Sequence, residues 1–343
     1  YMKNNKFITI VTILVVAMIA CVSLVACNDK DGGNGANYRD DVNELTFSAP
    51  EGTPALAMLR LVTDNEKIDG TKVNYKVVKP ANIAVEMSSK SSDLVIMPVN
   101  AGANLIRQGA DYKLVSVAVN GSLYMIGNTD SGVITLDDIK GKVVACIGQT
   151  GVPGLVFRYV MNANGIQMVT DENATIGANQ VGVRYVADGP AARVLLASGK
   201  ADFAVVGEPA ATQFKTALLL SSEMDMQAEY ARVSGASNYA QAGLFVRSGL
   251  AKDTAFMKAL FDALSANKTW ITANPSDVTS FAKEHLYESA TFPAPSIPRC
   301  AINATKLDET QKSEILTFLA NVMPKDSQGN VINWQDSKDK IFA

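Results

Sequence analysis

The chain has 343 residues, of which 48% are apolar and 19% are charged, an ordinary globular composition with enough apolar material for about two domains. The formal net charge is −3 and the basic residues form no cluster, so nucleic acid is not expected as a partner. Four cysteines without a C-x-x-C pair and a single histidine exclude a zinc site built from Cys and His. We expect no metal and no cofactor.

The first 26 residues have the layout of a secretory signal peptide. Two lysines precede the apolar run Phe7–Ala20, and small residues follow it. The apolar stretch is also long enough to span a bilayer as a helix of about 20 residues, so an uncleaved anchor remains an alternative, as does plain secretion. Leu24-Val25-Ala26-Cys27 resembles the bacterial lipobox, which implies cleavage after residue 26 and acylation of Cys27, for example with palmitate.

Residues 27–43 are rich in Gly, Asp and Asn and offer almost nothing to bury. Such a composition is typical of a disordered segment, and 16 residues after Cys27 would reach roughly 20–24 Å as a flexible chain. We expect a tether that holds a folded domain just off the membrane surface.

From residue 44 onward, apolar strand-like runs alternate with helical stretches, the pattern of an α/β protein with parallel sheets. The last third is mostly helical and is punctuated by prolines. The strands are expected at 44–48, 73–78, 93–98, 113–120, 123–127, 142–147, 181–186, 201–207, 231–233 and 244–247. The main helices are expected at 55–63, 102–108, 155–164, 189–198, 210–220, 253–274, 276–286 and 308–323.

Three segments share one geometry, a buried strand that ends in a turn of small residues and leads into a helix. They are Ser48–Ala55, Met97–Ala103 and Ile147–Leu155. Ligands of open α/β sheets lie beyond the carboxyl ends of the strands, and the first turn of a helix offers unpaired N–H groups there. The three turns together predict a site for a polar or anionic solute without a fixed cation. The alternative is that they only connect elements.

Glu208 and Tyr239 are further candidates for solute contacts. Glu208 ends an apolar run and could accept a hydrogen bond from a ligand, but it could equally cap the next helix or pair with a cation. Tyr239 could contact a ligand or simply pack. The glycines at 148, 151 and 154 do not have the spacing of a dinucleotide fingerprint, and a phosphate P-loop would need a Gly-Lys-Ser/Thr ending that is missing.

Four segments in order resemble the substrate-binding lipoproteins of ABC importers in the nitrate, sulfonate and taurine group, which includes binders of thiamine-precursor pyrimidines. The segments are LTFSAPEGTPALAMLRL from Leu45, DLVIMPVNAGANL from Asp93, LDDIKGKVVACIGQTGVPGL from Leu136 and LLASGKADFAVVGEPAAT from Leu195. The similarity extends from about Leu45 to Leu286.

The resemblance implies an α/β, two-lobed type 2 periplasmic binding protein, with two crossover strands, C-terminal helices and the solute between the lobes. The first lobe would comprise 44–127 and 241–343, and the second 128–240. Gly207 before Glu208 departs from the aromatic-rich pattern of the pyrimidine binders. The implied solute contacts are Gly52, Thr53, Asn100, Ala101, Gln149, Thr150, Gly151, Glu208 and Tyr239.

The implied function is binding of a small polar or anionic organic solute and its delivery to a permease and its ATPase. The protein would be a monomer, anchored through Cys27 on the extracytoplasmic face of the membrane or in the periplasm. A ligand-sensing lipoprotein without transport shares every one of these features. An enzyme of the pyrimidine-synthase or menaquinone-related branch of the fold is a third reading, but no His or Cys stands beside a base at the predicted turns, so no catalytic residue is expected.

Overall fold

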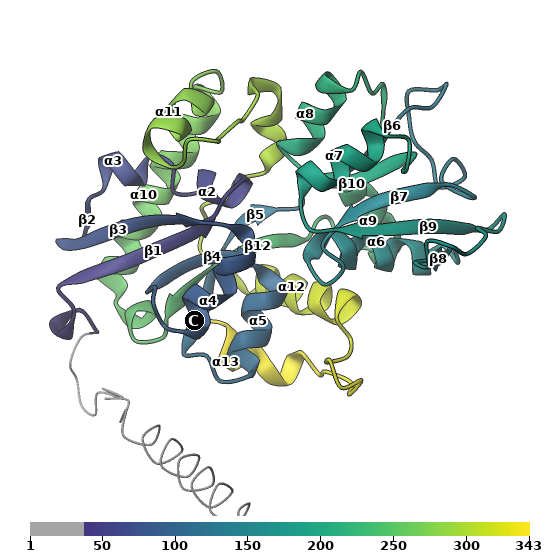
Figure 1. Ribbon diagram of the computed structural model, residues 1–343. Helices are drawn as coiled ribbons and strands as arrows, with labels where there is room; N and C mark the ends of the chain where they lie inside the picture. Colours follow the sequence, from purple (N-terminus) through teal and green to yellow (C-terminus); the bar gives the residue numbers. More distant parts are fainter. Residues whose placement is uncertain (1–37) are drawn as a thin grey trace, which may run out of the picture. The chain divides into compact units, whose positions relative to one another are not determined.

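The computed structural model describes residues 38–343 (Figure 1). The predicted signal peptide, the lipidation site Cys27 and the first part of the tether lie outside the described residues. Among the helices of 38–343, none is both long and apolar enough to cross a membrane.

Two six-stranded mixed sheets organise the described residues (Figure 1). The first has the order β2-β3-β1-β4-β12-β5 and the second β11-β6-β10-β7-β9-β8. The strands of the first sheet are β1 (Glu44–Pro50), β2 (Lys67–Ile68), β3 (Thr71–Val78), β4 (Leu94–Pro98), β5 (Tyr112–Asn120) and β12 (Ala240–Arg247). Those of the second are β6 (Leu123–Gly127), β7 (Val143–Ile147), β8 (Gln167–Val169), β9 (Gln180–Val186), β10 (Phe203–Gly207) and β11 (Ser222–Asp225).

The central strands of both sheets run parallel, as their apolar sequences predict. In the first sheet β1 pairs in parallel with β3 and β4. In the second, β7 pairs in parallel with β9 and β10. Parallel strands place their carboxyl ends at one edge of the sheet, so the turns that follow β4 and β7 lie at corresponding edges of the two lobes.

The chain passes from the first sheet to the second between Asn120 and Leu123 and returns before Ala240. The prediction that residues 123–127 belong to the first lobe is wrong, because β6 pairs with β10 and β11 of the second sheet. From the local sequence, Gly121-Ser122 is expected to form a hairpin turn, whereas in the structure these two residues connect the two lobes.

Helices cover both faces of the first sheet (Figure 1). Strand alternation separates the two cores: Val95 and Met97 pack on one face of β4, and Leu94 and Ile96 on the other. The first face is covered by α4 (Ile83–Ser88), α5 (Val99–Arg107), α12 (Glu309–Val322) and α13 (Lys338–Ile341). The second is covered by α2 (Thr53–Leu56), α3 (Leu61–Asp64) and α10 (Thr254–Ala273), and α11 (Val278–His285) packs with α2 and α10 in a separate cluster. Two predictions differ from the structure: the predicted helix 55–63 is two short helices, and residues 231–233, expected as a strand, lie in a helix, α9 (Met226–Ser234).

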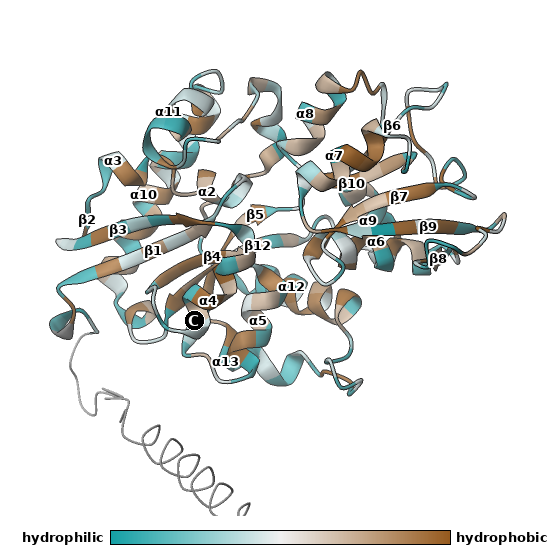
Figure 2. Ribbon diagram, in the orientation of Figure 1, coloured by the Kyte–Doolittle hydropathy of each residue, from teal (hydrophilic) through white to brown (hydrophobic). Residues whose placement is uncertain are grey.

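The second lobe is built in the same way. Cys146 faces the core under α6 (Val152–Ala163) and α9 (Met226–Ser234), while its neighbour Ala145 faces α7 (Gly189–Ala197) and α8 (Ala210–Ala217). Cys146 is fully buried, as expected of a small apolar side chain. Figure 2 shows the apolar residues gathered on the strands of both sheets. The remaining short turns are η2 (Tyr38–Asp41), η3 (Pro80–Asn82), η4 (Leu250–Lys252), η5 (Ala294–Ser296), η6 (Pro298–Cys300) and η7 (Gln335–Ser337).

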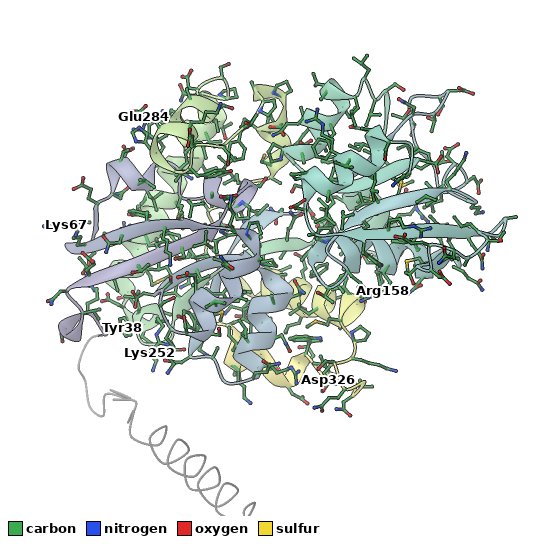
Figure 3. All side chains as sticks on the ribbon, in the orientation of Figure 1. Tyr38, Lys67, Arg158, Lys252, Glu284 and Asp326 are labelled. Atoms are coloured by element: carbon green, nitrogen blue, oxygen red, sulfur yellow. The ribbon has the colours of Figure 1, made fainter. Side chains whose placement is uncertain are left out.

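The end of the predicted flexible tether is ordered against the first lobe. Tyr38 donates a 2.7 Å hydrogen bond to Asp93 Oδ1, and Arg39 Nε lies 2.7 Å from Asp253 Oδ2. Tyr38 is labelled at the edge of this lobe in Figure 3. The tether prediction is therefore wrong for residues 38–43, because these two side chains find partners that the local composition does not indicate.

Candidate solute-binding site

The helices α5 and α6 begin at the predicted turns, and neither has a side-chain cap. Their N-cap residues are Pro98 and Gly151, which have no side-chain oxygen to offer. The backbone N–H groups of the first turn of each helix are left without intrahelical partners. In contrast, α7, α9, α10 and α12 are each capped by an aspartate: Asp188, Asp225, Asp253 and Asp308.

The two lobes meet directly at these turns. Asn100, in the first turn of α5, donates from Nδ2 to the Thr150 carbonyl at 3.1 Å. Thr53 donates from Oγ1 to the Glu208 carbonyl at 2.6 Å. We call these four residues the interlobe corner. The structure thus brings together two predicted contacts from the first lobe and two from the second.

Asn100 contains a polar atom without a partner. Its side chain is almost fully buried, with 5% of the residue exposed, and Oδ1 accepts no hydrogen bond from any described residue. A buried acceptor that has lost water and gained nothing costs free energy. Such an atom at the contact between lobes is the feature expected where a solute completes the structure.

The turn before α6 presents Gln149 and Thr150 at the surface, and Gly151 is half-buried. Gly151 N–H donates to the Gly148 carbonyl at 3.1 Å, so the turn closes on itself. A Cβ atom at Gly154 would lie 2.3 Å from the Gly148 oxygen. The glycine at 154 thus lets the turn fold tightly over the start of the helix, which explains the glycine spacing without a nucleotide.

The substitution Gly154→Ala is expected to displace this turn, because the obstructing atom is backbone and cannot move aside alone. We expect a loss of about 1–3 kcal/mol in the free energy of unfolding, measured by urea denaturation. Gly199→Ala, where a Cβ meets nothing within 4 Å but φ is +67°, reports the cost of positive φ without a clash. Equal losses from the two substitutions would contradict the steric account.

The predicted contact Gly52 is differently placed. Its φ is +96°, and its N–H already donates to the Tyr287 hydroxyl at 2.9 Å. The helix that follows, α2, has only four residues. Of the three predicted turns, this one therefore contributes the Thr53 side chain rather than free backbone N–H groups. Ala101 is half-buried in the first turn of α5.

Glu208 fulfils both structural alternatives considered for it. Its carboxylate accepts hydrogen bonds from Thr212 N at 3.1 Å and Thr212 Oγ1 at 3.0 Å, and so caps the start of α8. It also accepts from Arg299 Nε. The side chain is fully buried, and three hydrogen bonds leave it little capacity for a solute.

Arg299 is a residue of the interface that the sequence did not indicate. It lies in η6 of the first lobe, where nearby Ile302 bridges to Val119 of β5. Its Nη1 and Nη2 donate to Glu223 of the second lobe at 3.0 and 3.1 Å. Its guanidinium carbon stands 3.8 Å from the centre of the Tyr124 ring.

Arg299 thus places a cation at the contact between the lobes. The arginine stands in a proline-rich segment far along the chain and not at the end of any strand, so the pattern used for the three turns could not find it. Its charge is shared between two carboxylates of the opposite lobe, Glu208 and Glu223. The cation thus joins the lobes and is not left free for an anionic solute.

We expect acid to loosen this contact. Burial alone raises the pKa of Glu223, but hydrogen bonds from Arg299 and Lys215 outweigh it and hold the pKa below 4.5. A depressed pKa means that the ionised group stabilises the folded, closed form above pH 4.5, and that this contribution is lost as pH falls through the folded pKa. Small-angle X-ray scattering should show the lobes separating as the pH falls below 4.5 and through the lowered pKa of Glu223. Glu223→Gln should remove the contribution at neutral pH, and an identical acid transition in that variant would contradict this assignment.

In the structure Tyr239 packs, which is the second of the two roles considered for it. The residue is 3% exposed, and its ring stacks on Phe318 at 5.2 Å with an interplanar angle of 11°. Its hydroxyl donates to Gln227 Oε1 at 2.8 Å. Tyr239 therefore belongs to the packing beneath the crossover and has no free group to offer.

A separate cavity of about 230 Å³ lies between α6 and the end of α12. Arg158, labelled in Figure 3, and Lys325 are among its lining residues. The lining includes none of the nine predicted solute contacts. The interlobe corner is the stronger candidate for a solute site, because it includes residues of the predicted turns and a buried polar atom without a partner among the described residues.

Comparison with known proteins shows the fold. No protein-family model matches the sequence, and no curated protein does. Among solved structures, an ABC transporter protein from Parabacteroides distasonis is 20% identical with a TM-score of 0.67, covering 84% of this chain and 96% of that one. The fold is that of a type 2 periplasmic binding protein.

Two further structures support this conclusion about the fold. The ligand-binding component of an ABC-type import system from Staphylococcus aureus, with zinc bound, is 10% identical with a TM-score of 0.62, covering 88% of this chain and 97% of that one. The periplasmic aliphatic sulphonate binding protein SsuA from Escherichia coli is 13% identical with a TM-score of 0.57, with coverages of 81% and 85%. In residues 38–343 of this protein, no group of three His, Cys, Asp or Glu side chains could hold a metal ion.

Proposed function

We propose that this protein is an extracytoplasmic solute-binding lipoprotein of an ABC importer. It binds a small polar or anionic organic solute, of the sulfonate, nitrate, taurine or pyrimidine type, between its lobes and delivers it to a permease and its ATPase. Acylated Cys27 holds the monomeric protein at the membrane. Within the described residues, the first lobe comprises 38–120 and 240–343, and the second lobe the part between.

The observation that carries the proposal is the Asn100 side chain. It comes from the first lobe, bonds the second lobe through Nδ2 and keeps Oδ1 buried without a partner. A solute that satisfies this atom and also bonds the first turn of α6 gains its full set of contacts only when the lobes are closed. Binding would therefore shift a hinge equilibrium toward the closed form, which is the form a permease can distinguish.

The reactive side chains favour binding over catalysis. Cys146 and Cys300 are fully buried, and burial raises the pKa of the Cys300 thiol to about 12. A buried thiol of high pKa is a poor nucleophile. His285 is in α11, beside Phe281 at a ring distance of 4.3 Å, and not at the interlobe corner. A ligand sensor with the same site remains the second candidate, and it differs in lacking a permease partner.

The test uses residues 38–343, which form a compact unit of their own. Melting temperature is measured against a panel of sulfonates, nitrate, carboxylates and pyrimidines. A true solute at a concentration about 100-fold above its dissociation constant should raise the melting temperature by roughly 3–6 °C.

Two variants locate the site. Thr53→Tyr places a large side chain where Thr53, 3% exposed, meets Glu208, and it should abolish the shift. Val194→Tyr, on the outer face of α7 where Val194 is 64% exposed, should leave the shift intact. If the shift persists in Thr53→Tyr, the solute binds elsewhere.

A further inference from the structure

The orientation of the Asn100 side-chain amide constrains the chemistry of the solute as well as its location. Its Nδ2 faces the Thr150 carbonyl, a group that can only accept hydrogen bonds. Turning the amide over would set two oxygens against each other, so the orientation is fixed by the protein. Oδ1 is therefore an acceptor, buried at the contact between lobes, and it has no donor among the described residues.

The side-chain donors at the contact between the lobes are already engaged. Thr53 Oγ1 donates to the Glu208 carbonyl. Arg299 directs Nε, Nη1 and Nη2 at two carboxylates. A solute composed only of acceptors, such as nitrate or a simple alkanesulfonate, would leave Oδ1 as it stands and would add a second electronegative group beside it.

Hydrogen-bond donors are also present at the interlobe corner, as backbone N–H groups. The first turns of α5, which has nine residues, and α6, which has twelve, lack side-chain caps. Their N–H groups favour an acceptor or an anion. The interlobe corner therefore offers donors from two helices and one buried acceptor from a side chain.

We infer that the solute carries an N–H or O–H donor, which it gives to Asn100 Oδ1, together with an anionic or acceptor group that binds the first turns of α5 and α6. This inference rests on the proposed function and narrows it. Amino-sulfonates, amino acids and aminopyrimidines fit the site, whereas nitrate and unsubstituted alkanesulfonates do not.

The test compares pairs of compounds that differ only by an amino group in place of a methyl group. The pairs are taurine and propane-1-sulfonate, β-alanine and butyrate, and 4-aminopyrimidine and 4-methylpyrimidine. Isothermal titration calorimetry on residues 38–343 gives the affinity ratio within each pair. For the pair that matches the natural solute, the amino compound should bind at least about tenfold more tightly.

Asn100→Leu shows whether this preference depends on Oδ1. The variant also loses the bond to Thr150, but that loss weakens both members of a pair equally, so the ratio isolates the oxygen. The ratio should fall to within about threefold of unity. Asn100→Gln, which keeps both the amide donor and the acceptor, should retain a preference for the amino compound and so controls for damage to the fold.

The results of these titrations distinguish a failure of the inference about the solute's donor group from a failure of the proposed binding function. If the methyl compounds bind as tightly as the amino compounds, or if the preference survives in Asn100→Leu, the inference is wrong while the binding function stands. If none of the six compounds binds, the proposed solute class fails, and the inference fails with it.

Discussion

Removing Arg299 should open the protein. In Arg299→Ala, Glu208 keeps a fully buried side chain but loses its cation, and Glu223 loses two hydrogen bonds. Leaving a buried charge without its partner costs about 3–5 kcal/mol, which we reduce to about 2–4 kcal/mol because the arginine is 28% exposed. The lobes can relieve this cost by separating and letting water reach Glu208. We expect a larger radius of gyration in small-angle scattering and a smaller loss of melting temperature than the full cost implies.

Two controls sharpen this prediction. Arg232→Ala breaks an ion pair with Glu229 within the second lobe, on a side chain that is 51% exposed, and should leave the radius of gyration unchanged. Glu208→Gln combined with Arg299→Ala removes the buried charge and should recover part of the closed population. If Arg299→Ala stays as compact as the native protein, the ion pair does not hold the lobes together.

Gln227→Leu should be among the most damaging single substitutions in the second lobe. Gln227 Oε1 accepts from Leu123 N at 2.7 Å and from the Tyr239 hydroxyl at 2.8 Å, and Nε2 donates to the Leu123 carbonyl at 2.9 Å. Leucine has nearly the same shape but leaves these three buried groups without partners. At about 1–3 kcal/mol for each group, and with some relaxation, we expect a loss of about 3–5 kcal/mol in the free energy of unfolding.

Urea denaturation measures this loss directly. Gln335→Leu, at an exposed position, is the matched control and should change the free energy of unfolding by less than about 0.5 kcal/mol. Gln227 hydrogen-bonds Leu123, the first residue of β6, just after the chain enters the second lobe. The variant should therefore also increase the rate of amide hydrogen exchange at Leu123. A Gln227→Leu protein as stable as the control would show that these hydrogen bonds are replaced by other partners.

Local sequence patterns predicted most of the elements. The apolar run 93–98 corresponds to β4, Leu94–Pro98, and the expected helix 253–274 corresponds to α10, Thr254–Ala273, which Asp253 caps. These elements could be predicted because the periodicity of apolar residues and the capping residue are properties of the chain within a few turns. The sheet to which a strand belongs is decided by distant partners, and for that reason local patterns assign β6 to the wrong lobe.

The same distinction applies to the site. Asn100 and Thr150 could be predicted because each follows the end of a parallel strand, where ligands of α/β proteins bind. Arg299 follows no strand, and nothing near it in the chain indicates that it reaches the other lobe. The local sequence could not decide between solute contact and packing for Tyr239, because the groups that pack against it, Phe318 and Gln227, lie on other elements.

The central claim is that a solute is held between the lobes at the interlobe corner. A crystal structure of residues 38–343 with a compound that raises the melting temperature tests it most directly. Our account predicts electron density for the compound within hydrogen-bonding distance of Asn100 Oδ1 and of the first turn of α6, with both lobes in contact with it. Density in the cavity between α6 and α12, or on the surface of one lobe, with Oδ1 of Asn100 still without a donor, would contradict it.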